Sequence, residues 1–200
     1  MCDYQERRRQ QAQKTEQAIL EAAMELCRQE SFDKVSVRDI CKYAGITTGA
    51  FYHHFRSKDE LLSRGFTSLD VYMEQVLRGH ESEPPEQRLR LILFSYASFM
   101  EDLGWELVAR YYQHRLGQPD FHSIDPRRFT LQALLKCLTD AQSQKLLLTV
   151  QTPEWIAQFL FRHFRGVVVD WTINRGSYSL LEKLEQDYLF FKRIFQANPK

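Results

Sequence analysis

Apolar residues recur along most of the chain at the spacing of an amphipathic helix. Between residues 14 and 30 they fall at i, i+3, i+4, i+7 and i+8, at Ile19, Ala22, Ala23, Leu26 and Cys27, which places them on one helical face. The strict alternation of apolar and polar residues that marks a strand is nearly absent. We therefore predict an all-α fold of about nine helices.

Start and stop signals divide the pattern into elements. Ser36 can cap a short helix that Gly45 ends, and Thr47 can cap a second short helix that reaches His54. The capping box at residues 57–60 starts a helix that we expect to run over 58–77. Further on, periodicity and the prolines and glycines between segments predict helices over 86–103, 105–116, 127–141, 153–174 and 178–196.

The two short helices around Gly45 have the spacing of a helix-turn-helix. Val37, Ile40, Cys41 and Ala44 on the first helix, and Phe51 and Phe55 on the second, must pack on helix 14–30 because nothing else nearby can bury them. That packing leaves small and hydroxyl-bearing residues facing outward, namely Thr48, Gly49, Ala50, Tyr52 and His53. A surface of this kind suits the major groove of DNA.

Charge is distributed unevenly along the chain. The net charge is only +1, but residues 34–58 carry five basic residues against one acidic residue, whereas residues 65–200 are neutral overall. A local basic segment in an otherwise balanced chain is typical of a phosphate contact. The polar N-terminal stretch and the absence of a long apolar run favour a cytoplasmic protein without membrane contact.

The sequence carries little that points to catalysis. It has no glycine-rich phosphate loop, no nucleophile elbow and no His/Glu pair at metal spacing. His53 and His54 are adjacent, so they point about 100° apart on a helix and cannot chelate one metal. The four cysteines show no C-x-x-C spacing. We expect neither an enzyme, nor a cofactor, nor a metal site.

Residues 15–62 resemble the N-terminal domain of the TetR (tetracycline-repressor) family of transcriptional regulators. The resemblance rests on Phe32 and on "VSVRDI", "AGI", "GAFYHHF" and "SKDELL", which fall in register. It implies a three-helix DNA-binding domain over residues 1–62 and a helical ligand-binding and dimerisation domain over 63–200, linked by helix 58–77. The family usually has glycine where this chain has Ser31, so Ser31 must either turn left-handed or end the first helix differently.

The resemblance also implies a role in DNA binding for particular residues. Arg38 corresponds to a position that reaches a guanine edge, and Arg7-Arg8-Arg9 resembles a basic arm that some members lay in the minor groove. The other positions implied in base or phosphate contact are Ser36, Thr47, Thr48, Gly49, Ala50, Tyr52, His53 and Lys58.

For residues 63–200 the implied architecture is a helix pair from each subunit forming a homodimer. The residues expected at that interface are Phe164, Val168, Trp171, Leu184, Tyr188 and Phe191. An apolar or aromatic effector is expected in a pocket lined by Phe99, Trp105, Tyr111 and Phe159. The predicted function is thus a repressor that leaves a palindromic operator on double-stranded DNA when a small molecule binds. A constitutive DNA-binding protein with a filled core is the alternative.

Overall fold

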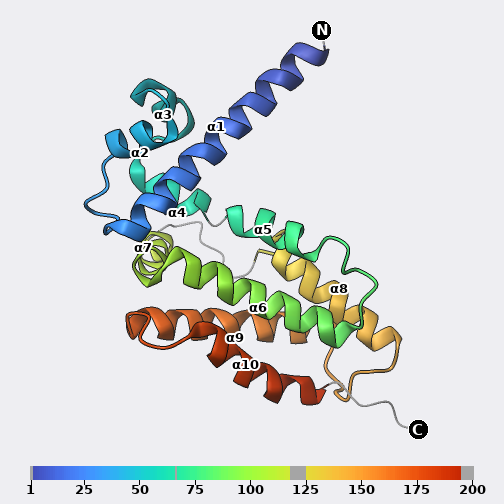
Figure 1. Cartoon of the computed structure of the whole chain (residues 1–200). Coiled ribbons are helices and arrows are strands. Elements are labelled where there is room, and N and C mark those ends of the chain that lie inside the picture. Colours follow the sequence, from blue (N-terminus) through green and yellow to red (C-terminus); the bar gives the residue numbers. More distant parts are fainter. Residues whose placement is uncertain (1, 66, 118–124, 195–200) are drawn as a thin grey trace. The chain divides into compact units, whose positions relative to one another are not determined.

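The computed structural model describes residues 2–65, 67–117 and 125–194, and every element within them is helical (Figure 1). The ten α-helices and a final 3-10 turn are α1 (Cys2–Gln29), α2 (Val37–Ala44), α3 (Thr48–His54), α4 (Lys58–Gly65), α5 (Thr67–Leu77), α6 (Pro85–Leu103), α7 (Trp105–Leu116), α8 (Phe129–Ser143), α9 (Pro153–Ile173), α10 (Leu180–Phe191) and η1 (Lys192–Ile194). The all-α prediction is confirmed.

One predicted boundary was wrong. α1 begins at Cys2 rather than near residue 14, because residues 2–13 contain good helix formers and neither glycine nor proline. The helix predicted over 58–77 is described as α4 and α5, on either side of residue 66, which lies outside the described residues.

The helices form two compact units. The first contains α1 to α4 together with α7 beyond Trp105, and the second contains α5, α6 and α8 to α10. The predicted division at residue 62 did not anticipate that α7 groups with the N-terminal helices.

The core of the first unit is an apolar cluster contributed by α1, α2, α3 and α4. Ile19, Ile40 and Phe51 are completely buried in it, and Phe55 is 1% exposed. The rings of Phe51 and Phe55 pack with their centroids 5.5 Å apart. Packing of the two phenylalanines on helix 14–30 is therefore as predicted, and it gives the seven-residue α3 a stability that so short a helix lacks alone.

Ser31 ends α1 without a left-handed residue. Among the described residues, the non-glycine residues with positive φ are Lys145 and Arg175, so Ser31 is not one of them. Its carbonyl instead accepts hydrogen bonds from the amides of Lys34 and Val35, which closes a turn between α1 and α2. The departure from the family pattern is thus absorbed by the turn.

In the second unit, α6 is the central helix, since it packs against α5, α8, α9 and α10 (Figure 1). Its Glu101 carboxylate accepts hydrogen bonds from the amides of Leu180 and Leu181 at the start of α10. An acidic group at a helix N-terminus is favourable because it meets unpaired amides and the positive end of the helix dipole. No described helix combines the length and apolar character that crossing a bilayer requires.

Candidate DNA-binding surface and effector pocket

Side-chain caps fix the starts of the two helices of the helix-turn-helix. Ser36 and Asp39 form a complete capping box at α2, and the Thr47 hydroxyl accepts a hydrogen bond from the Ala50 amide at 3.1 Å at α3. Between them, Gly45 takes a left-handed conformation with φ 66°, which lets the chain turn sharply after α2. The predicted helix-turn-helix is present.

One side of α3 is held in the core and the other is open. Thr48, Gly49 and His53 are exposed, and the Tyr52 side chain is 56% exposed with its ring set edge-on to Phe51. Ala50 is half-buried. With Phe51 and Phe55 held in the core and small side chains outward at its start, α3 can approach base edges closely while its backbone stays fixed.

The two residues at the start of α2 that were predicted to contact DNA differ in how far their side chains are available to bind it. Arg38 is exposed at the second helical position, so its guanidinium can reach outward. The Ser36 hydroxyl, although exposed, is bonded to the carboxylate and to the amide of Asp39. Ser36 therefore serves first as the cap of α2.

Lys58 lies differently from the predicted phosphate contact. Its ammonium donates to the carbonyls of Phe32 at 2.6 Å and Val35 at 3.0 Å, and it lies 4.4 Å from the centre of the Phe32 ring. These bonds tie the start of α4 to the turn after α1. The geometry favours a structural role for Lys58, and a phosphate contact would require the ammonium to leave these carbonyls.

The same turn is held from α7. The guanidinium of Arg110 forms an ion pair with the carboxylate of Asp33. The pair lies within the first unit, on the helix by which the chain re-enters that unit after α6 and Gly104.

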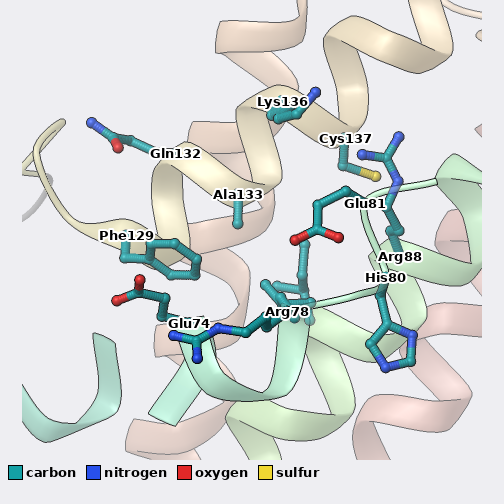
Figure 2. A pocket seen from close by; sticks show the side chains of 12 residues that line it. Glu74, Arg78, His80, Glu81, Arg88, Phe129, Gln132, Ala133, Lys136 and Cys137 are labelled. Atoms are coloured by element: carbon teal, nitrogen blue, oxygen red, sulfur yellow. The ribbon is translucent and has the colours of Figure 1, made fainter. Parts of the chain in front are cut away.

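The second unit contains a pocket of about 360 Å³ between α5, the segment that follows it, α6 and α8. Figure 2 shows Phe129, Ala133 and Lys136 of α8 on one side, facing Arg78 and Glu81 across the opening. The remaining lining residues are Glu74, Leu77, His80, Arg88, Ile92, Gln132 and Cys137. This volume is at the small end of the range of ligand pockets, about 300–1,000 Å³.

None of the four residues predicted to line a pocket lines this one. Phe99 is 6% exposed with its ring against Tyr72, and Trp105 lies against Gly176, where an added Cβ would come within 3.0 Å of the indole. Tyr111 is buried in the other unit, and Phe159 is 43% exposed on the surface of α9. These residues are large aromatics in or around the core, and size alone does not distinguish a pocket wall from packing.

Arg88 was the signal that sequence reasoning missed. It stands four residues before Ile92, on the helix face that is otherwise apolar, and it is buried. A charge on a buried stripe needs a partner or a function. Groups of three or more side chains that could hold a metal do not occur in the part of the chain that the structure describes.

The residues predicted at the dimer interface lie in the core of the protomer. Phe164, Val168 and Leu184 are completely buried within it, and the other three residues predicted there, Trp171, Tyr188 and Phe191, are at most 7% exposed. Side chains buried in this way offer little surface to a second subunit.

The apolar residues that α9 and α10 leave exposed are others. Trp155 and Phe159 stack face to face on α9, with ring centroids 5.3 Å apart and planes 6° apart. The outer stripe, as we call this set, consists of Trp155, Phe159 and Ile173 of α9 and Leu189 and Phe190 of α10, each between 43% and 73% exposed.

A search against family models places residues 19–64 in the family described as "Bacterial regulatory proteins, tetR family". The matched residues contain the capped α2, the turn at Gly45 and α3 with its open face. Residues 19–64 are thus a TetR-family DNA-binding domain. The predicted class, a helix-turn-helix transcriptional regulator, is therefore confirmed.

The likeness to TetR-family regulators extends beyond the matched domain. The transcriptional regulator AcrR of Shigella flexneri is 26% identical over 90% of this chain and 88% of its own. TtgR of Pseudomonas putida is also 26% identical, over 90% of each chain. Among solved structures, FadR of Bacillus subtilis in complex with stearoyl-CoA superposes with a TM-score of 0.62, at 18% identity over 87% of this chain and 96% of that one. The likeness in fold therefore extends beyond the matched residues 19–64.

Proposed function

We propose that this protein is a dimeric transcriptional repressor that binds a palindromic operator and leaves it when a small apolar molecule enters the pocket of the second unit. The observation that carries the proposal is α3, a helix held on one side by buried Phe51 and Phe55 and open on the other. Such a helix is already ordered for insertion into a major groove, so binding costs little conformational entropy.

The proposed base contacts come from the first turn of α3 and from Arg38. Thr48, Gly49 and Ala50 offer a hydroxyl, a bare backbone and a methyl group at the surface. Arg38 suits a bidentate bond to guanine, and Tyr52 and His53 suit phosphate oxygens. Lys58 is left out of this set because its ammonium is bonded within the domain.

Dimerisation is proposed through the outer stripe in place of the buried residues first expected. Trp155, Phe159 and Phe190 are large apolar side chains in water, and exposed apolar surface of this kind marks association sites. The TetR-family precedent of pairing helices near the C-terminus across a two-fold axis points to α9 and α10, the helices that carry the stripe.

The pocket favours a ligand-responsive regulator over a constitutive one. The pocket of about 360 Å³ beside the central helix is large enough for a small ligand, which supports an effector. The regulators that this chain resembles include one solved with stearoyl-CoA bound, which supports a small-molecule effector here as well.

The proposal can be tested with the purified protein and operator DNA selected from a random library. We expect the selected sequences to be palindromic and a single half-site to bind far more weakly, because two recognition helices of a dimer share the full site. Equal affinity for half and full sites, or no selected sequence at all, would contradict a dimeric repressor.

A further inference from the structure

The walls of the pocket differ in charge between the floor and the rim. Three lining residues are buried and form the floor, namely Arg88, Ile92 and Cys137. The charged lining residues at the rim, Glu74, Arg78, Glu81 and Lys136, are exposed and balance each other. Water screens rim charges, so the ionic group that a ligand meets out of water is the guanidinium of Arg88.

Arg88 is a buried cation with a donor that the protein leaves unused. Its side chain is 9% exposed, and its Nη2 donates to Asp140 at 2.8 Å. Its Nε is buried and has no hydrogen-bond partner within the protein. A buried donor without a partner is unfavourable, so a group of this kind calls for an acceptor.

The groups around Arg88 do not supply an acceptor for its Nε. Burial alone would raise the pKa of the Asp140 carboxyl, but hydrogen bonds from Arg88 and Lys136 outweigh it and lower the pKa, so Asp140 is ionised. Two cations thus share one carboxylate. Cys137 adds no negative charge, because burial raises the pKa of its thiol to about 11 and its Sγ donates to the Pro85 carbonyl at 2.9 Å.

We propose that the effector is an amphiphile with one anionic head group, bound by Arg88 at the floor, and an apolar chain along Leu77, Ile92 and Phe129. This deepens the proposed function by giving the chemical class of the effector, and it rests on that function. A carboxylate is the simplest head that accepts from guanidinium, and charge-assisted bonds of this type are the strong ones in a dry site. A chain of modest length suits a pocket of about 360 Å³.

The test is a series of ligands with one ten-carbon chain and three head groups: decanoate and decyltrimethylammonium below their micellar concentrations, and decanol below its solubility limit. Binding to the full-length protein is measured by calorimetry in the absence of DNA. We expect decanoate to bind about tenfold or more tightly than decanol, and the cation to bind least well. No preference for decanoate would overturn the proposal, and so would tighter binding of the cation.

Two variants should shift the preference for decanoate over decanol in opposite directions. Asp140→Asn removes the carboxylate that competes for Arg88, so decanoate should bind more tightly while decanol is unchanged. Arg88→Gln combined with Asp140→Asn removes the pair together, which avoids an unpaired buried charge and should abolish the preference for decanoate. Arg90→Gln is the matched control, since Arg90 is exposed on the same helix and pairs with Glu185 outside the pocket.

The failure of this inference can be told apart from the failure of the proposed function. A protein that binds its operator and is released by decanol or by the cation, with no effect of decanoate, is a ligand-responsive repressor whose effector is not anionic. If the protein binds decanoate as expected but binds no operator, the anion site is supported and the proposed repressor function is contradicted. If Arg88→Gln with Asp140→Asn folds, judged by its helical circular dichroism, and still prefers decanoate, the head group binds elsewhere and the proposal is wrong.

Discussion

Arg38 and Lys58 are both cations of the DNA-binding unit, but their surroundings indicate different roles for them. Arg38 is exposed beside the cap of α2, whereas Lys58 is half-buried and bonded to carbonyls of the turn after α1. The sequence showed both charges and their spacing. It could not show which of them turns inward, because that depends on where the carbonyls of residues 32–35 lie once α1 has ended.

Replacing Arg38 with alanine should cost about 1–3 kcal/mol of operator affinity and relax discrimination at one base pair of each half-site, because a bidentate base contact is lost. Gel shifts against single-base operator variants measure both effects. Lys42→Ala is the control, as an exposed cation in the last turn of the same helix. An even loss of affinity at every operator position would show that Arg38 does not read a base.

Replacing Lys58 with methionine should lower the free energy of unfolding of the protein by about 1–2 kcal/mol, because charge-assisted bonds to the turn after α1 are lost from a half-buried site. Urea unfolding followed by circular dichroism measures this, with Lys34→Met, an exposed lysine of the same turn, as the control. The salt dependence of operator binding should stay unchanged. A salt slope reduced by about one, with unchanged stability, would restore Lys58 as a phosphate contact.

At the scale of the helix, the apolar periodicity predicted well where the helices lie. It predicted poorly which apolar face of a helix packs inside the protomer. Residues 2–13 were missed because an exposed helix has no apolar stripe to detect. α9 and α10 carry apolar residues on two faces, and the more regular stripe, with Phe164 and Leu184, lies in the protomer's own core. A pattern of apolar positions indicates that a helix face is buried, but it does not indicate which surface covers that face. The outer stripe could therefore be identified only from the structure.

Phe190→Glu should convert the dimer into monomers without changing helix content. The side chain is 68% exposed in the protomer, so the charge costs nothing there, but it would be unpaired and desolvated in a subunit interface. Analytical ultracentrifugation measures the result. Val150→Glu is the control, because Val150 is 98% exposed and lies outside α9 and α10. A dimer that persists in the Phe190 variant would place the interface away from the outer stripe.

At the scale of the whole molecule, the chain itself connects the pocket of the second unit to the DNA-binding unit. The chain passes from α6, whose Arg88 and Ile92 line the pocket, through Gly104 into α7, which is held to Asp33 by Arg110. No pattern in the sequence revealed that α7 groups with the DNA-binding helices, because the ion pair joins residues 77 positions apart.

Arg110→Ala should weaken the coupling between effector and operator. Typical couplings loosen operator binding by about 5- to 150-fold, with the same factor acting on effector binding. Because the Arg110–Asp33 pair is partly exposed, its loss should reduce that factor by about fivefold or less. Operator affinity is measured with and without effector, with Arg127→Ala as the control, whose ion pair with Asp125 lies within one loop. An unchanged factor would exclude this ion pair from the coupling.

Each unit contains cysteines whose thiols are buried or half-buried, and their labelling rates can report local opening. Cys27 and Cys41 lie in the DNA-binding unit and Cys137 lies in the pocket floor, and burial raises the pKa of all three thiols, to about 11 for Cys27 and Cys137. A thiol that is protonated and shielded reacts with a maleimide only when its surroundings open, so the rate of labelling reports local opening. With Cys2 replaced by serine, mass spectrometry can time the two units separately in one sample. An effector should slow the labelling of Cys137 and operator DNA that of Cys41, and identical rates for both would mean that the two units open together.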